Sequence, residues 1–255
     1  MSLQILTIPC RADNYAYIAH DPASGATAVI DVPEAAPILD ALDRSGWRLS
    51  DVLLTHHHHD HVEGLSELLD HSPARVIGAA ADAHRLPPLD IAVTEGDEVT
   101  IGNEAGRVID VSGHTLGHIA FHFAGSGAVF TGDSLMALGC GRVFEGTMAQ
   151  MHASLGKLAA LPPYTLIYSG HEYTEANAAF ARSVDPDNPR LADRTREITE
   201  TRAAGHPTVP ASLGLELATN PFLRAHDPDI RAHLGMARAT DAEVFAEIRT
   251  RKDRF

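Results

Sequence analysis

A run of metal-binding side chains, THHHHDH at residues 55–61, has the spacing that one or two bound ions require. The run follows a short apolar stretch that predicts a strand. In extended chain, residues i and i+2 project to the same side, so His56 and His58 point together, about 6–7 Å apart along the chain. Two imidazoles at that spacing can hold one divalent ion. Asp60 and His61 come where the chain turns into the next predicted helix, and they can bind a second ion.

Two metal ions need further ligands, and three more candidates each follow a glycine at the end of a predicted strand. These candidates are His114, Asp133 and His171. Folds that mix strands and helices place their sites at the carboxyl ends of strands. A single Gly-His pair is usually only part of a loop, so these residues gain their meaning from the histidine run that accompanies them.

The other histidines near these motifs have different expected roles. His57 and His59 alternate to the opposite side of the run, so we interpret them as spacers or as residues that support the ligands. His118 is the best candidate to form a hydrogen bond with a ligand, since ligand histidines usually donate their second N–H to a partner.

The elements that must position the ligands are short strands alternating with helices in the first two thirds of the chain. Many of the strands are apolar on consecutive positions, as expected for sheets covered on both faces. A helix is predicted from Pro33 to about Ser45 and another over Val62–Leu69. The predicted strands are Leu3–Ile8, Tyr15–Ala19, Ala26–Asp31, Val52–Thr55, Arg75–Ala79, Glu98–Ile101, Arg107–Val111, Ile119–Phe123, Ala128–Thr131 and Thr165–Ser169.

The pattern changes after the last of these strands, and only helical patterns follow. We therefore predict a boundary near residue 172, with an α/β domain over 1–172 and a helical domain over 173–255. The predicted helices of the second domain are Glu175–Ser183, Pro189–Ala204, Ser212–Thr219 and Asp241–Lys252.

The composition excludes several classes of partner. The 255 residues include 20 Lys and Arg against 34 Asp and Glu, a formal charge of −14. Such an excess of negative charge argues against nucleic acid or an anionic membrane as the main partner. No apolar run approaches the roughly 20 residues that span a bilayer. The start of the chain has no leader pattern, and the two cysteines, Cys10 and Cys140, are expected to be reduced thiols. We therefore expect a cytoplasmic protein.

The motifs together resemble those of one known family. HxHxDH followed by a distant His, Asp and His is the pattern of the metallo-β-lactamase superfamily. Within it, the chain is similar to glyoxalase II, the hydroxyacylglutathione hydrolases, over essentially its whole length. The resemblance implies an αββα sandwich of two mixed sheets flanked by helices, followed by a small C-terminal helical domain. The motifs are THHHxDH, GHTxGH at 113–118, FTGDSL at 130–135, CGRxFEGT at 140–147, GHEY at 170–173, TVPxSL at 208–213, NPFLR at 220–224 and RxxKDxF at 249–255.

The resemblance also implies a ligand set for two divalent cations. Zinc is the expected metal, and iron or manganese suits the same ligands. A carboxylate can bridge two ions because it has two oxygens. Asp60, as a proton relay, and the bridging Asp133 are also the expected catalytic residues. The seven ligands are His56, His58 and His114 for one ion, Asp60, His61 and His171 for the other, and Asp133 for both.

The implied reaction is hydrolysis of the thioester of an S-(2-hydroxyacyl)glutathione. D-lactoyl is the expected acyl group, and the reaction is the second step of methylglyoxal detoxification. Two close ions can share a hydroxide that attacks the thioester carbonyl, and a thiolate leaves with little help from a general acid. The residues implied in glutathione binding are Arg249 and Lys252, which would bind its glycine carboxylate, Tyr173, and Arg142 and Phe144, which replace a Lys and a Tyr of some members. We expect a monomer that binds this small molecule.

Other functions fit these motifs less well. A β-lactamase or lactonase of the same superfamily is the nearest alternative, but such β-lactamases often use a cysteine ligand and lack a helical tail ending in Arg-x-x-Lys. A persulfide dioxygenase would need only part of the ligand set. A flavodiiron-type module would have a carboxylate in place of one of the early histidines and would also need a flavin domain. A purely metal-binding module would not need a bridging carboxylate and a second metal. A nuclease would require a basic channel.

Overall fold

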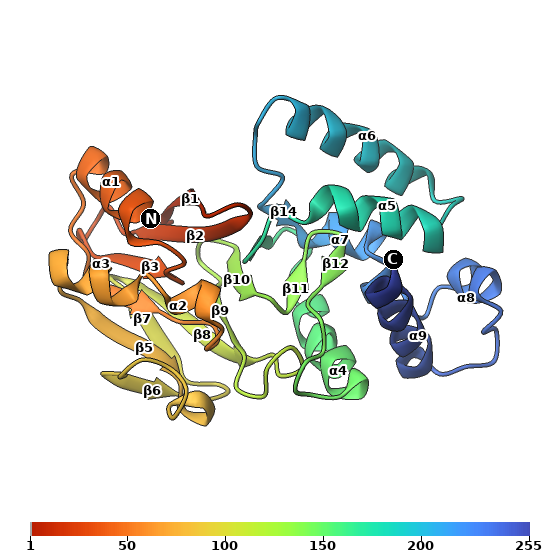
Figure 1. Ribbon diagram of the computed structural model, residues 1–255, viewed down its shortest axis with the longest axis horizontal. Helices are drawn as coiled ribbons and strands as arrows, with labels where there is room; N and C mark the ends of the chain where they lie inside the picture. The colour runs from red at the N-terminus through yellow and green to blue at the C-terminus, as the bar shows by residue number, and fades with distance from the viewer. Residues whose placement is uncertain (1) are drawn as a thin grey trace. The chain divides into compact units, whose positions relative to one another are not determined.

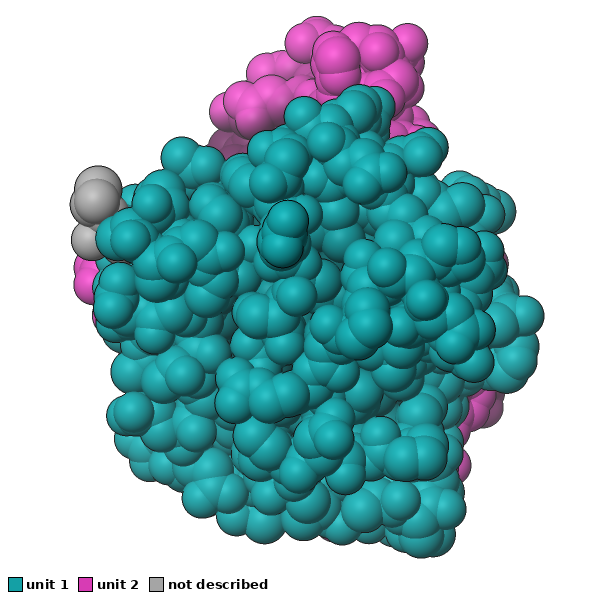
Figure 2. Space-filling model, turned by 90° about the vertical axis from the view of Figure 1, so that its left-hand side faces the viewer, with its two compact units in different colours: residues 1–111, 116–132 teal, residues 112–115, 133–255 magenta. Residues whose placement is uncertain are grey.

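The computed structural model describes residues 2–255 and divides into two compact units. Unit 1 consists of Met1–Val111 and Leu116–Gly132, and unit 2 of Ser112–Thr115 and Asp133–Phe255. Figure 1 shows the elements along the chain, and Figure 2 colours unit 1 teal and unit 2 magenta. The main division between the two units lies just before Asp133, whereas the sequence predicts a domain boundary near residue 172. That domain boundary stays a prediction.

Unit 1 begins with a mixed sheet whose strands lie in chain order. β1, β2 and β3 pair antiparallel, whereas β3, β4, β5 and β6 pair parallel. Parallel neighbours need crossover connections, and helices supply them: α1 lies between β3 and β4, and α2 and α3 lie between β4 and β5. The elements are β1 (Gln4–Cys10), β2 (Asn14–His20), β3 (Thr27–Ile30), α1 (Ala35–Ser45), β4 (Asp51–Leu53), α2 (His59–Val62), α3 (Leu65–His71), β5 (Arg75–Ala79), the 3-10 helix η1 (Ala80–Asp82) and β6 (Ile91–Val93).

The rest of unit 1 is an antiparallel series of four strands. These are β7 (Glu98–Ile101), β8 (Glu104–Asp110), β9 (Ile119–Phe123) and β10 (Ala128–Gly132). The core forms between this series and the first sheet, where the rings of Tyr17 and Phe130 lie 5.6 Å apart. β2, β3 and β10 are buried along their whole length, as their consecutive apolar residues predict.

Unit 2 is mainly helical but also contains two short strand pairs. The hairpin of β11 (Leu135–Met136) and β12 (Gly139–Cys140) accepts hydrogen bonds at its backbone from the side chains of Asn177 and Asn220. These bonds explain why the hairpin groups with the helices that follow it. The other elements are α4 (Met148–Ala159), β13 (Leu166–Ser169), α5 (Thr174–Val184), α6 (Pro189–Ala203), β14 (Ala211–Ser212), α7 (Leu213–Thr219), the 3-10 helix η2 (Pro221–Leu223), α8 (Pro228–Leu234) and α9 (Asp241–Arg254).

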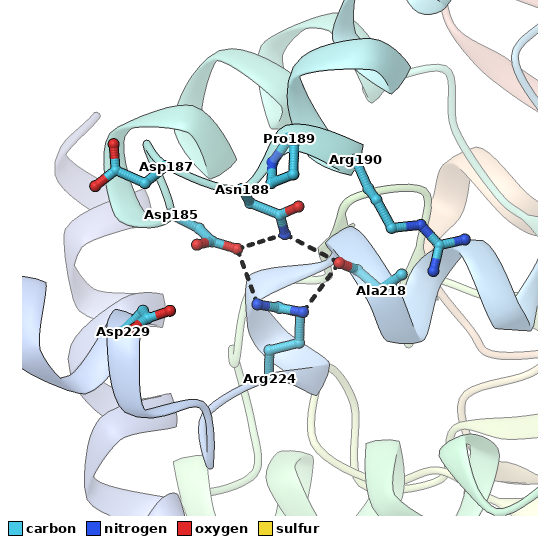
Figure 3. A pocket seen from close by; sticks show the side chains of 8 residues that line it. All are labelled: Asp185, Asp187, Asn188, Pro189, Arg190, Ala218, Arg224 and Asp229. Carbon is cyan, nitrogen blue, oxygen red and sulfur yellow. Dashed lines mark hydrogen bonds and ion pairs between the residues drawn. The ribbon is translucent and has the colours of Figure 1, made fainter.

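Polar caps begin most helices of unit 2. Thr147 and Thr240 form capping boxes with Gln150 and Glu243 at the starts of α4 and α9. Near the start of α6, Asp185, Asn188 and Arg224 line a pocket of about 370 Å³ and are joined by the contacts drawn in Figure 3. The residues that line this pocket are distinct from the expected site residues.

Most predicted elements are confirmed. The strands Arg75–Ala79, Glu98–Ile101 and Ile119–Phe123 coincide with β5, β7 and β9. The prediction that only helices follow the strand Thr165–Ser169 is wrong, because β14 pairs antiparallel with β13. The predicted helix Val62–Leu69 is two helices, α2 and α3. The elements that the sequence patterns did not reveal are α4, α8, η1, η2, β6, β11, β12 and β14.

In residues 2–255, none of the helices combines the length and the apolar character that crossing a membrane would take.

Candidate metal centre

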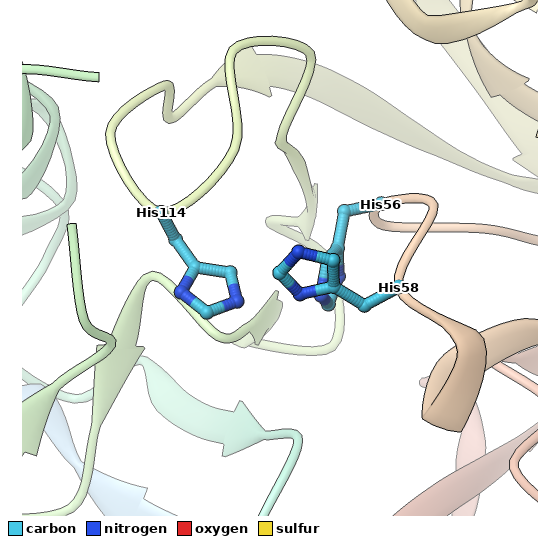
Figure 4. Close-up of side chains that lie close together, drawn as sticks. All are labelled: His56, His58 and His114. Carbon is cyan, nitrogen blue, oxygen red and sulfur yellow. The ribbon is translucent and has the colours of Figure 1, made fainter. Parts of the chain in front are cut away.

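The loop after β4 carries the histidine run of unit 1. The rings of His56 and His58 meet edge to face with their centroids 4.7 Å apart, so the two side chains do point to the same side, as predicted from the extended chain. His56 is fully buried. Figure 4 draws these two rings, and with them the ring of His114 from the loop after β8.

Asp31, directly after β3, organises this loop through three hydrogen bonds. Its carboxylate accepts from the backbone N–H of Thr55, from the Thr55 hydroxyl and from Nδ1 of His61, each at 2.8 Å. Because the Thr55 hydroxyl donates to Asp31, it accepts from Nδ1–H of His56 at 3.0 Å. In both rings Nδ1 therefore carries the proton, and Nε2 carries the lone pair that can bind a metal.

Sequence analysis missed Asp31 as a functional residue. A signal was present, since Asp31 is a polar residue at the end of a buried strand, which is the same rule that selected the ligand candidates. Asp31, His56 and His61 together form a buried group whose possible ligand atoms lie within 4.8 Å of one another.

Asp60 and His61 lie in α2, the single helical turn that follows the loop. Oδ2 of Asp60 is 3.8 Å from Nε2 of His61. The His61 side chain is fully buried, whereas that of Asp60 is 38% exposed. Thus one potential ligand is held in the core and the other reaches towards solvent.

The neighbouring histidines differ in environment, and the hydrogen bond expected between His118 and a ligand stays a prediction. Nδ1 of His57 forms a hydrogen bond of 2.9 Å with the buried carboxylate of Asp82, and the side chain of His59 is 76% exposed. The ring of His118 is buried and stacks on the ring of His56 at 4.5 Å. His118 therefore supports a predicted ligand by ring packing.

In unit 2, Asp133 lies between the two other predicted histidine ligands. Its Oδ2 is 3.5 Å from Nε2 of His114 and 3.3 Å from Nε2 of His171. Charge-assisted hydrogen bonds are shorter, about 2.7–2.9 Å. Two ligand atoms bound to one tetrahedral zinc ion lie roughly 3.3 Å apart, given metal–ligand bonds of about 2.0–2.1 Å. The spacing of these side chains therefore fits ligands of a metal.

The loops around Asp133 need glycine. A Cβ on Gly141 would lie 2.0 Å from the carbonyl oxygen of Asp133, and Gly132 has a φ of +48°. The residue after Gly141 also fixes the orientation of the His114 ring, because Nδ1–H of His114 donates to the carbonyl oxygen of Arg142 at 2.7 Å. His114 therefore also directs its Nε2 lone pair towards a metal.

Two aromatic residues expected to bind substrate lie beside the histidines of unit 2. The ring of Tyr173 stacks on His171 at 4.7 Å with an interplanar angle of 7°, and Tyr173 is 40% exposed. The ring of Phe144 lies 5.3 Å from that of His114 and is 62% exposed. Both rings present an apolar surface to solvent next to predicted ligands.

The cations expected to bind glutathione have unequal environments. Arg249 is 4% exposed, donates to the carbonyl oxygen of Cys140 at 2.7 Å and pairs with Asp253 at 2.9 Å. Lys252 is only half-buried, and its Nζ donates to a backbone carbonyl of α5 at 3.1 Å. Burial, together with the charge of Arg249, lowers the pKa of Lys252 below its ordinary value. Nε of Arg142 lies 3.5 Å from the same Asp253.

The donor set fits a divalent cation. Imidazole nitrogens and carboxylate oxygens are the ligands that zinc, iron and manganese share. Three of the imidazoles have Nδ1 engaged by a neighbour, so their Nε2 atoms are oriented before any metal binds. The histidine and aspartate clusters of the chain can therefore bind a divalent metal ion.

The fold and these clusters define a class of protein. The family model of the metallo-β-lactamase superfamily matches residues 21–171. The B3 metallo-β-lactamase BLEG-1 superposes with a TM-score of 0.67 at 20% identity, covering 86% of this chain and 99% of its own. ETHE1 from Myxococcus xanthus superposes with a TM-score of 0.58 at 28% identity, covering 86% and 96%. The expected fold class, mixed sheets flanked by helices with a C-terminal helical region, is confirmed.

Sequence comparison narrows this class to one family. The model of the hydroxyacylglutathione hydrolase C-terminus matches residues 172–255. Hydroxyacylglutathione hydrolases of Cereibacter sphaeroides and Ruegeria pomeroyi are 62% and 63% identical to the chain over 255 residues, with complete coverage of both sequences. The chain belongs to the hydroxyacylglutathione hydrolase family, so the resemblance inferred from its motifs is confirmed.

Proposed function

We propose that the protein hydrolyses the thioester of an S-(2-hydroxyacyl)glutathione, chiefly S-D-lactoylglutathione, to glutathione and a 2-hydroxy acid. Full-length relatives that carry the name hydroxyacylglutathione hydrolase support this proposal. The observation that carries it is the position of Asp133, whose Oδ2 lies within 3.5 Å of Nε2 of both His114 and His171. The carboxylate of Asp133 could therefore share a bound metal ion with each of these two imidazoles.

The proposed centre holds two divalent cations, most simply zinc. When bound, the cations supply a nucleophile by lowering the pKa of water and polarise the thioester carbonyl. Asp31, Thr55 and the carbonyl of Arg142 orient the imidazole rings. Asp60 and Asp133 are the proposed catalytic carboxylates. The proposed ligands are His56, His58, His114, Asp60, His61, His171 and the shared Asp133.

The chain also supplies the groups that would bind glutathione. The ammonium of Lys252 and the guanidinium of Arg142, whose side chain is 60% exposed, can pair with carboxylates of the substrate. The exposed faces of Tyr173 and Phe144 can pack against its apolar parts. Arg249 would hold the neighbouring backbone in place without contacting the substrate, because its guanidinium already donates to the carbonyl oxygen of Cys140 and to Asp253.

The products leave without a further catalytic acid from the chain. Cleavage releases a thiolate, whose conjugate acid has a pKa near 8.5, so the leaving group needs little protonation. Asp60, at 38% exposure, can pass a proton between the site and solvent. A monomer acting in the cytoplasm remains our prediction for assembly and location.

The test is a thioesterase assay on metal-loaded protein, followed by the loss of the thioester's ultraviolet absorbance. S-D-lactoylglutathione should be hydrolysed, a chelator should abolish turnover, and a simple lactam and a simple lactone should be inert. His56→Ala, His114→Ala and Asp133→Ala should each lose metal and nearly all hydrolysis. His206→Ala, at an exposed loop position, is the matched control. Hydrolysis of the lactam or lactone with an inert thioester would move the function elsewhere in the superfamily.

A further inference from the structure

We propose that Asn14 is a positioning residue that holds the carboxylate of Asp60 in place for a divalent cation. The inference rests on the proposed role of Asp60 as a ligand. Asn14 is the first residue of β2 and is 4% exposed. Its Nδ2 lies 3.1 Å from Oδ2 of Asp60 and 3.1 Å from the backbone carbonyl oxygen of the same residue.

The chemistry of these contacts fixes which end of the Asn14 amide faces Asp60. Both neighbouring atoms of Asp60 are acceptors, so the NH₂ end must face them. An amide NH₂ has two N–H donors, and Asp60 receives both of them. Asn14 therefore ties the side chain of Asp60 to its own backbone through a single nitrogen atom.

The hydrogen bond from Asn14 to the carbonyl oxygen of Asp60 follows from the shortness of α2. In a longer helix, the N–H of Gly64 would donate to the carbonyl oxygen of Asp60. Here the N–H of Gly64 donates to Val32 instead, at 2.9 Å, and α2 ends after one turn. The carbonyl oxygen of Asp60 is thus one of the terminal carbonyls that a helix leaves for another donor, and Asn14 supplies that donor.

The turn that precedes Asn14 is itself held close to α2. Arg11, at a positive φ of 51°, donates its backbone N–H to Glu34 at 3.0 Å and its Nε to the carbonyl oxygen of Pro33 at 3.1 Å. Its guanidinium also forms an ion pair with Glu63, the residue that follows α2. These contacts of Arg11 therefore hold in place the hairpin end from which Asn14 reaches Asp60.

The hydrogen bond from Asn14 to the carboxylate of Asp60 is the one that bears on metal binding. The same Oδ2 of Asp60 lies 3.8 Å from Nε2 of His61, and the His61 ring is already fixed by Asp31. Because the Asp60 side chain is 38% exposed, without Asn14 it could adopt other rotamers in water, and binding a metal would then cost rotamer entropy. Partners that orient a ligand typically contribute 10–100-fold to metal affinity.

The experiment measures zinc affinity of the full-length protein by competition with a chromophoric chelator. Asp60→Asn first identifies the zinc ion that the Asp60 carboxylate binds. Asn14→Asp, which keeps the size of the side chain but removes both donors, should weaken that same zinc about 10–100-fold and leave other bound zinc unchanged. In an Asp60→Asn background, Asn14→Asp should add little further loss, because the two residues act as one unit.

Asn103→Asp is the matched control. Nδ2 of Asn103 also donates to an aspartate of unit 1, Asp21, at 3.0 Å. This pair is outside the histidine cluster, so zinc affinity should stay at the wild-type value. Asn14→Leu provides a second, uncharged substitution in case Asn14→Asp does not fold.

A purely structural role predicts a different result. If Asn14 only caps α2, its variants will lower the melting temperature of the metal-free protein while every zinc keeps its wild-type affinity, and the proposal is then wrong. It is equally wrong if Asp60→Asn weakens no zinc. Wild-type protein that binds zinc but does not hydrolyse the thioester would instead overturn the proposed function and leave the role of Asn14 intact.

Discussion

Nδ1 of His61 donates to Oδ2 of Asp31 at 2.8 Å, and both side chains are almost completely buried. The same carboxylate receives the backbone N–H and the hydroxyl of Thr55. One residue thus sets the ring of a predicted ligand and the conformation of the chain that enters the histidine run. Such a contact explains how the run keeps one geometry although most of it lies outside regular structure.

Replacement of Asp31 should therefore impair both metal binding and folding. Asp31→Ala removes the acceptor of His61 and leaves the buried N–H of Thr55 without its partner, which costs about 1–3 kcal/mol. Metal affinity should fall about 10–100-fold. Metal titration and urea unfolding of the metal-free protein measure the two effects. Asp70→Ala, at an exposed position of α3, is the control. Wild-type metal affinity in Asp31→Ala would refute the orienting role.

The two cations of α9 should respond differently to truncation. Arg249→Ala leaves the buried carbonyl oxygen of Cys140 without its donor, so unfolding should become easier by about 1–3 kcal/mol. Lys252→Ala should change stability by less than about 1 kcal/mol and mainly raise KM for the glutathione thioester. This revises the expectation that both residues act chiefly in binding. Chemical unfolding and steady-state kinetics on the same preparations distinguish a loss of stability from a loss of substrate binding. Equal stability of the two variants would contradict the structural role of Arg249.

Binding of the thioester should weaken at alkaline pH because of Lys252. Its pKa lies below the ordinary 10.5, so the ammonium is lost earlier than in a free lysine. Between the folded and unfolded pKa values the unfolded chain binds more protons, so this residue makes stability rise with pH there. KM should rise through the same window. Lys252→Arg keeps its charge and should flatten the KM profile; an unchanged profile would show that Lys252 does not bind the anion.

The two cysteines should be unreactive in the folded protein. Burial raises the pKa of Cys10 to about 12 and that of Cys140 to about 11, the latter despite the neighbouring Arg249. Since the thiolate is the reactive form, iodoacetamide at mildly alkaline pH should modify neither in the native state and both after denaturation. Mass spectrometry of the labelled protein gives the count. Rapid native labelling of Cys140 would contradict its burial against α9.

Local patterns were enough to predict the parts of the site that depend on chain geometry alone. His56 and His58 share a side because extended chain has a period of two residues, and the structure places their rings 4.7 Å apart. The buried strands that precede the ligands were recognisable because a strand covered on both faces has apolar residues at consecutive positions. The two-residue strand β14 was not, because two residues form a strand only when another strand lies beside them.

The family, the metal-binding residue types and most of the strands could be predicted from the amino-acid sequence, since these depend on composition, motif and short-range periodicity. Three features are visible only in the folded chain: Asp31 fixes His61, Asn14 contacts Asp60 from 46 residues away, and Arg249 is buried where Lys252 is not. Each of these facts depends on which distant segments pack together and in what register. That choice is made by the burial of the whole core, and no short stretch of sequence contains it.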